Sequence, residues 1–101
     1  MAFNHLSCEQ LLQTIQENPS HYTIVDIRDR ASFEAGHIEQ AMHVDNGNVD
    51  TFLMQADKSR PLVVCCYHGN SSQGAADYFH QQGFHQTFSL DGGYEYWKTL
   101  V

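Results

Sequence analysis

The apolar residues of this chain are gathered into short runs, and segments with helical spacing lie around them. Four runs are rich in β-branched and aromatic residues and end at turn residues or charges, which is typical of strands; they cover residues 22–27, 41–44, 62–66 and 86–90. Helical spacing is found from Ser7 onward and at residues 29–37, 48–56, 71–82 and 94–100. Continuous apolar strands that alternate with helices predict an α/β fold, with a mostly parallel sheet covered by helices on both faces.

Several of the expected helix ends carry capping residues. Ser7 and Gln10 form a capping-box pattern, and Asn48 stands where an N-cap is expected. Gly36 and Gly83 follow helical segments and suit the left-handed conformation that often ends a helix. These residues predict where two helices begin and where two others end.

The charge of the chain narrows the classes of partner. There are 12 acidic and 5 basic residues, which gives a net charge of −7. Since nucleic acids and anionic membranes bind clustered Lys and Arg, neither is expected as a partner. An anionic substrate would have to be held locally, by backbone amides or a helix end. The seven histidines are scattered along the chain, so we expect no metal site.

Length and composition predict one soluble domain over residues 1–101. No apolar run approaches the roughly 20 residues that a membrane span needs, and the first residues do not resemble a secretory signal. The three cysteines are an odd number without the spacing of a disulfide framework. Free thiols are typical of a reducing compartment, and we expect a cytoplasmic protein.

Two of the cysteines are adjacent, at the end of an apolar run. Successive side chains of a strand point to opposite faces, so Cys65 and Cys66 cannot both face the following loop. We interpret Cys65 as a packing residue and Cys66, at the strand end, as the candidate for chemistry. Cys8 lies on the apolar face of the first helical segment and is expected in the core. In a parallel sheet, ligands bind at the carboxyl ends of the strands, where Cys66 is placed.

A short polar loop separates Cys66 from the next helical segment, where Ser71 or Ser72 could act as the N-cap. Consecutive backbone N–H groups in such a loop can converge on an anion, and Gly69 supplies conformational freedom. One or two charge-assisted hydrogen bonds of about 1.5–3 kcal/mol each, with a helix-dipole contribution of about 0.3–1 kcal/mol, would stabilise a thiolate there. No general base is required, although His68 is close in sequence.

Three segments resemble one known family, and together they span most of the chain. The stretch "CYHGNSS" at residues 66–72 resembles the active-site loop of the rhodanese family of sulfurtransferases. "VDIRDRASFEAGHIEQAMHV" at residues 25–44 and "SLDGGYEYW" at residues 89–97 are similar to its N-terminal and C-terminal signatures. More narrowly, the chain resembles the single-domain thiosulfate sulfurtransferases of the GlpE type. The resemblance implies a rhodanese-like fold with a small five-stranded sheet.

The resemblance also implies a two-step sulfur transfer without a metal or an organic cofactor. Cys66 would take the outer sulfur of thiosulfate, release sulfite, and pass the persulfide sulfur to cyanide or to a thiol acceptor such as thioredoxin. A monomer or a weak homodimer is expected. The residues implied in substrate binding are those of the loop: Tyr67, His68, Gly69, Asn70, Ser71 and Ser72.

The loop departs from many family members at its second and sixth positions. Many of these proteins carry Arg there, whereas this chain has Tyr67 and Ser71. Without a guanidinium to bind the sulfonate group, we expect weak thiosulfate binding.

Other residues of the matching segments are expected to build structure. Asp26 and Arg28 would join loops through an ion pair, His37 would be a hydrogen-bonded structural residue, and Trp97 would lie in the core. The role of His68 stays open between loop architecture and substrate contact.

Two other functions remain as alternatives. A cysteine-dependent phosphatase or arsenate reductase needs Arg six positions after its cysteine, and here Ser72 stands at that position. A loop of this length also suits a sulfur atom better than a tetrahedral phosphate. The second alternative is a sulfur-carrier or binding module whose Cys66 receives its sulfur from a partner enzyme.

Overall fold

Five parallel strands form the sheet at the centre of the protein, as a computed structural model that describes residues 2–101 shows. The spatial order is β1-β5-β4-β2-β3, and each neighbouring pair is parallel. The strands are β1 (Asn4–Leu6), β2 (Thr23–Asp26), β3 (Met42–His43), β4 (Leu62–Cys65) and β5 (Thr87–Leu90). The predicted α/β class and parallel sheet are therefore confirmed, and β4, which leads to Cys66, lies in the middle.

The first strand is the one element without a counterpart among the predicted strands. Only Leu6 of its three residues is buried, so β1 shows no apolar run. It is held by pairing with β5, in the register Asn4 to Phe88 and Leu6 to Leu90. A strand this short depends on its partner, which is distant in the sequence.

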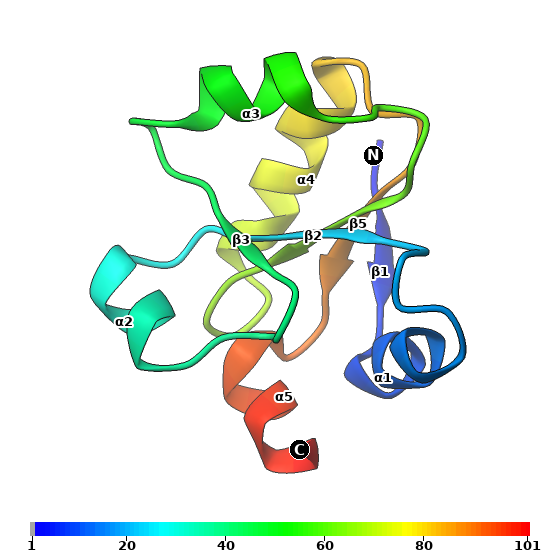
Figure 1. Cartoon of the computed structure of the whole chain (residues 1–101), viewed down its shortest axis with the longest axis vertical. Helices are drawn as coiled ribbons and strands as arrows, with labels where there is room; N and C mark the ends of the chain where they lie inside the picture. The colour runs from blue at the N-terminus through cyan, green and yellow to red at the C-terminus, as the bar shows by residue number, and fades with distance from the viewer. Residues whose placement is uncertain (1) are drawn as a thin grey trace.

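Helices cover both faces of the sheet, as predicted (Figure 1). On one face, α3 and α4 pack over the strands, and α1, α2 and α5 lie on the other side. The helices are α1 (Cys8–Glu17), α2 (Arg30–Ala35), α3 (Val49–Gln55), α4 (Ser71–Gln81) and α5 (Gly93–Leu100). Where both ends were predicted, the bounds differ from the predicted ones by at most two residues.

The two faces of β4 contribute to two separate hydrophobic clusters. Val63 and Cys65 pack in the cluster beneath α1 and α5, whereas Leu62 and Val64 pack in the cluster beneath α3 and α4. This alternation is the period of two that the strand pattern predicted. Cys65 is fully buried, and its assignment as a packing residue is confirmed.

The capping predictions have mixed outcomes. The capping box at Ser7 and Gln10 is present, with Gln10 N–H donating to Ser7 Oγ at 3.1 Å. Asn48 occupies the N-cap position of α3 but makes no side-chain cap, because its amide group bonds the preceding turn. Gly83 follows α4 with φ +110°, as expected for the residue that ends a helix.

The predicted left-handed conformation of Gly36 is wrong. Its φ of 165° is extended backbone that any residue can adopt. Space is limited there instead, because a Cβ would lie 2.8 Å from the Tyr94 hydroxyl oxygen and the Tyr94 side chain would have to shift. Among residues 2–101, no helix is both long enough and apolar enough to cross a lipid bilayer.

Candidate active site

Cys66 is the first residue after β4, one position beyond the end of the strand. Cys66 is only 3% exposed, and it lies at the carboxyl edge of the central strand of the sheet. A tight loop leads from Cys66 to α4, which begins at Ser71. The candidate nucleophile therefore lies where ligands bind in parallel sheets.

Three polar groups surround the sulfur of Cys66. The N–H groups of Gly69 and Ser72 donate to Sγ at 3.2 and 3.3 Å. The thiol also donates to the hydroxyl oxygen of Ser72 at 3.2 Å. If Cys66 loses its proton, that hydroxyl can turn to donate instead, so a thiolate would accept three hydrogen bonds.

The N-terminus of α4 is built differently from the prediction. Asn70 is the N-cap residue and makes no side-chain cap, while Ser71 is exposed and is the first residue of the helix. Ser72 is fully buried, and its hydroxyl faces Cys66 and Ser89 instead of capping the helix. The prediction that Ser71 or Ser72 caps α4 is wrong. Because the side chain of Asn70 does not cap the first turn, the Ser72 N–H is available to the sulfur.

Two other predicted loop residues direct their side chains elsewhere or into solvent. The Tyr67 hydroxyl donates to the carboxylate of Asp29 and lies 3.3 Å from the Ser32 hydroxyl. His68 is exposed, and its ring makes no hydrogen bond within the described chain. Among the six predicted loop residues, Gly69 and Ser72 are those that contact the sulfur.

The start of α5 holds the loop that follows β4 through backbone hydrogen bonds, a role that the sequence did not predict. Tyr94 N–H donates to the carbonyl oxygen of Cys66 at 2.9 Å, and Glu95 N–H donates to that of Tyr67 at 3.1 Å. Gly93 makes this approach possible, with φ +60° and no side chain. A Cβ on Gly93 would lie 2.5 Å from the carbonyl carbon and oxygen of Tyr67.

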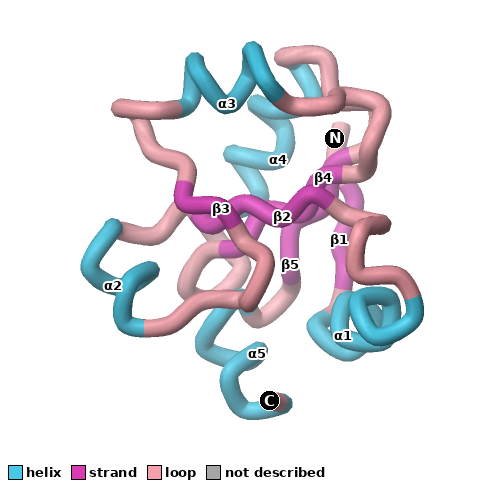
Figure 2. The backbone as a smooth tube through the Cα atoms, viewed as in Figure 1, coloured by secondary structure: helices cyan, strands magenta, loops and turns pink. Residues whose placement is uncertain are grey.

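Gly69 is the second glycine that the site requires, and its predicted role is confirmed. Its φ is +93°, and a Cβ would lie 3.0 Å from the nitrogen of Gly92. The loop after β4 and the turn after β5 therefore lie side by side, although more than 20 residues separate them (Figure 2).

A buried serine of β5 completes the site. The hydroxyl oxygens of Ser89 and Ser72 are 2.7 Å apart, and neither residue is exposed. The sequence reasoning missed Ser89 because a single serine in the run "QTFSL" carries no motif. Its polar character within an apolar strand was the available signal.

A family model of the rhodanese-like domain matches residues 7–100. This chain belongs to the rhodanese family. It is 51% identical over 98 residues to the thiosulfate sulfurtransferase GlpE of Pseudomonas aeruginosa. The aligned region covers 97% of this chain and 86% of that protein. The GlpE protein of Shewanella oneidensis is also 51% identical, over 95% of this chain and 93% of its own length.

The fold comparison agrees with the family. A rhodanese-like domain from Anabaena superposes with a TM-score of 0.85 at 27% identity, over 95% of this chain and 74% of that one. The five-stranded rhodanese-like fold that the motifs implied is therefore confirmed.

In this rhodanese domain, the Asp26–Arg28 ion pair is buried and joins three segments. Arg28 Nη2 lies 2.7 Å from Asp26 Oδ2 and donates to the carbonyl oxygen of Gly36 at 2.7 Å. The guanidinium also lies 4.2 Å from the centre of the Tyr94 ring, next to the start of α5. The predicted scaffold role is confirmed. Arg28 is not one of the groups that hydrogen-bond the Cys66 sulfur.

The other two thiols of this rhodanese domain are kept in the protonated form. Burial, followed by the charges of Glu9 and Asp91, raises the pKa of Cys8 to about 11. Burial is also the main cause that raises the pKa of Cys65, with a further contribution from Asp26. Cys8 is buried in the core, as predicted, and donates to the Asp91 carbonyl oxygen at 3.3 Å.

Two further predictions of structural roles are confirmed. His37 is hydrogen-bonded through Nδ1 to the Ile38 carbonyl oxygen at 2.8 Å and stacks on the Phe33 ring. Trp97 is buried among the residues of the cluster beneath α1 and α5.

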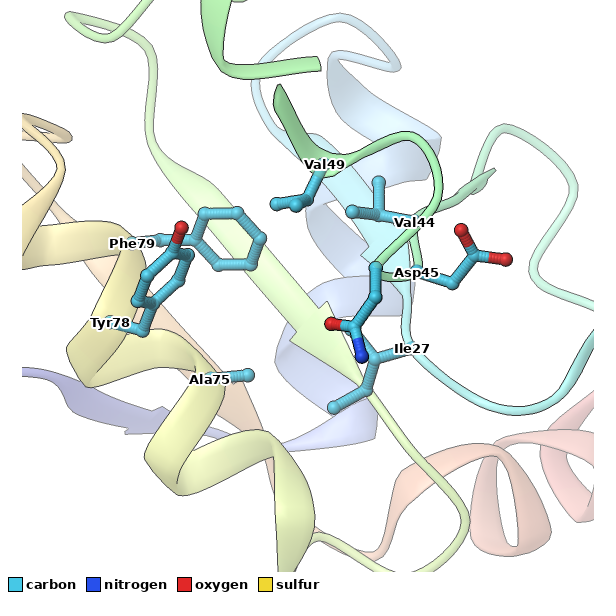
Figure 3. Close-up of a pocket in the computed structure, with 8 residues that line it drawn as sticks. Ile27, Val44, Asp45, Val49, Ala75, Tyr78 and Phe79 are labelled. Carbon is cyan, nitrogen blue, oxygen red and sulfur yellow. The ribbon is translucent and has the colours of Figure 1, made fainter. Parts of the chain in front are cut away.

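The pocket between α4 and the loop that follows β3 is separate from the Cys66 sulfur. This pocket has a volume of about 460 Å³ (Figure 3). Neither Cys66 nor any residue of the loop that follows it lines this space. The lining residues are Ile27, Val44, Asp45, Asn46, Val49, Ala75, Tyr78 and Phe79. Within residues 2–101, no three His, Cys, Asp or Glu side chains gather closely enough to hold a metal ion.

Proposed function

We propose that this protein is a thiosulfate sulfurtransferase in which Cys66 is the nucleophile. The observation that carries the proposal is the convergence of the Gly69 N–H, the Ser72 N–H and the Ser72 hydroxyl on one sulfur atom. The two relatives that are 51% identical over nearly the whole chain carry this activity in their names.

In the first step, the Cys66 thiolate attacks the outer sulfur of thiosulfate. A new S–S bond forms to Cys66, the S–S bond of thiosulfate breaks, and its electron pair leaves on sulfite. The products are sulfite and a Cys66 persulfide whose outer sulfur carries the negative charge. The total charge of −3 on the reacting species is the same before and after the step.

The loop stabilises negative charge without a cation. Each hydrogen bond to a charged group contributes about 1.5–3 kcal/mol, and the N-terminus of α4 adds about 0.3–1 kcal/mol. The amides of Tyr67, His68, Asn70 and Ser71 have no acceptor in residues 2–101, so they are free to bind the outer sulfur. Since the loop holds no guanidinium, thiosulfate itself is bound weakly.

In the second step, an acceptor attacks the outer sulfur and restores the Cys66 thiolate. Cyanide would leave as thiocyanate, and a thiol acceptor such as thioredoxin would leave as its own persulfide. The three free cysteines support a reducing compartment, and we infer a cytoplasmic protein. We further propose that residues 1–101 are one rhodanese domain acting as a monomer or a weak homodimer.

The mass of the protein after incubation with thiosulfate tests the proposal. We expect a gain of one sulfur atom that cyanide removes as thiocyanate. The gain should be absent in Cys66→Ser and retained in Cys65→Ser, the matched control one residue away. No gain in the unmodified protein would contradict the proposal.

The same variants separate the alternative functions. A sulfur carrier would gain sulfur from a partner enzyme but not from thiosulfate alone. A phosphatase would hydrolyse an aryl phosphate in a reaction that Cys66→Ser abolishes. The Ser72 hydroxyl occupies the position where such an enzyme needs a guanidinium, which favours sulfur transfer.

A further inference from the structure

The hydroxyl pair beside Cys66 is buried. Ser72 and Ser89 are both 0% exposed, and their oxygens are 2.7 Å apart. Ser72 comes from the first turn of α4, and Ser89 comes from β5, so tertiary packing alone brings them together. Within the described part of the chain, the Ser89 hydroxyl has Ser72 as its one hydrogen-bond partner.

The direction of hydrogen bonding in this pair depends on the protonation of Cys66. When Cys66 is a thiol, S–H donates to Ser72 Oγ, and either hydroxyl of the Ser72–Ser89 pair can then donate to the other. When Cys66 is a thiolate, the sulfur can only accept, so the Ser72 hydroxyl must turn toward it. The Ser72 oxygen then needs a donor, and the Ser89 hydroxyl is the group within reach.

We propose that Ser89 is a positioning residue for sulfur transfer, because its hydroxyl directs that of Ser72 toward the Cys66 sulfur. The expected effect on sulfur transfer rests on the proposed function, whereas the expected effect on Cys66 alkylation does not. The proton of Cys66 leaves to solvent, and the two hydroxyls only rotate, so no proton is stored in the pair. Ser89 acts at a distance from the substrate, through Ser72.

Other charged groups near the loop do not change in the variants that test this proposal. Asp26 is paired with Arg28 at 2.7 Å, and Glu95 is paired with Lys98 at 2.8 Å. His68 is exposed on the loop. Since these groups stay in place, a changed pH profile would report the hydroxyls.

Replacement of Ser89 by Ala is the first test, with iodoacetamide alkylation of Cys66 followed by mass spectrometry over a range of pH. Without Ser89 to orient the Ser72 hydroxyl, the pH at which the alkylation rate is half-maximal (the midpoint) should rise by about one pH unit. At pH values below the midpoints of both the variant and the unmodified protein, the variant would then hold roughly tenfold less thiolate. The maximal rate at high pH should be unchanged. The kcat/KM for thiosulfate should fall about tenfold at neutral pH and recover at high pH.

Thr87→Val is the matched control. Thr87 lies two residues earlier on the same face of β5 and is almost fully buried, and its hydroxyl oxygen has no hydrogen-bond partner among residues 2–101. We expect this variant to keep the midpoint of the unmodified protein. A midpoint that Ser89→Ala leaves unchanged, or that Thr87→Val moves equally, would overturn the proposal.

A double-mutant cycle keeps the test decisive if Ser89→Ala is less stable. Ser72→Ala removes the same hydroxyl from the sulfur, so Ser89→Ala should add little to the shift that Ser72→Ala produces. Fully additive shifts would mean that the two hydroxyls act independently, against the proposal. Alkylation needs no sulfur transfer, so a protein inactive with thiosulfate would contradict the proposed function and leave this test intact.

Discussion

Replacement of Gly93 by Ala should damage both the stability of the protein and its site. Gly93 has φ +60°, a conformation that costs an alanine about 1–2 kcal/mol. The new Cβ would lie 2.5 Å from the Tyr67 carbonyl atoms and 2.6 Å from the Cys66 carbonyl oxygen. Relief of this overlap requires the loop backbone to move by roughly 1 Å, and overpacking of this kind costs about 1–3 kcal/mol.

The two costs are partly offset in the unfolded chain, where alanine is less flexible than glycine by about 0.4–1 kcal/mol. The net loss of unfolding free energy is therefore about 2–4 kcal/mol. For a domain of this size, each kcal/mol lowers the Tm by about 4–8 °C, so we expect a decrease of about 10 °C or more. A misplacement of about 1 Å at the sulfur should also lower kcat/KM about 100-fold.

Thermal unfolding followed by circular dichroism and thiocyanate formation measure the two effects. The matched control is Gly74→Ala, since Gly74 lies within α4 and a Cβ there would meet no atom of residues 2–101 within 4 Å, apart from its chain neighbours and its own helix backbone. This control should stabilise the protein by about 0.5–1 kcal/mol and leave activity unchanged. Equal Tm and kcat/KM in the two variants would refute the role assigned to Gly93.

Three further predictions concern the buried charges and thiols. Asp26→Asn leaves the Arg28 guanidinium buried without its counter-charge, and should lower the unfolding free energy by about 3–5 kcal/mol in urea unfolding. Because folding raises the pKa of Cys8 to about 11 from 9.0, the unfolded chain loses this proton first as pH rises. Stability should therefore fall from about pH 9 upward. Cys8→Ala should make this fall less steep, while the contribution of Cys65 remains. A profile identical to that of the unmodified protein would contradict this prediction. Iodoacetamide at pH 8 should modify Cys66 alone, since burial keeps Cys8 and Cys65 protonated, and peptide mass mapping would detect any label on the other two.

The strands, the two faces of β4 and the capping box could be predicted from the sequence, because each produces a pattern within a short segment. The strands β2, β4 and β5 are apolar because both faces of the sheet are covered, and the period of two separated Cys65 from Cys66 without any tertiary information. The capping box at Ser7 was equally visible, because both of its partners lie within four residues. These signals are short-range, and the family motifs supplied the rest of the fold.

Features that depend on distant partners could not be predicted in this way. Ser72 was assigned to a helix cap because serine favours that position, but Ser89, 17 residues away, and Cys66 offer its hydroxyl better partners. Likewise, the glycine pair at the start of α5 indicated only a turn. Nothing local showed that Gly93 would lie against the carbonyl of Cys66.

The two backbone hydrogen bonds from Tyr94 and Glu95 to the loop also set an order of events during synthesis. The residues that hold the loop follow it in the sequence, so they leave the ribosome after the loop does. A nascent chain therefore carries Cys66 for some time before Tyr94 and Glu95 can hold the loop around its sulfur. On stalled ribosomes, sulfur transfer from thiosulfate should begin only when α5 is outside the exit tunnel, and activity in shorter nascent chains would contradict this order.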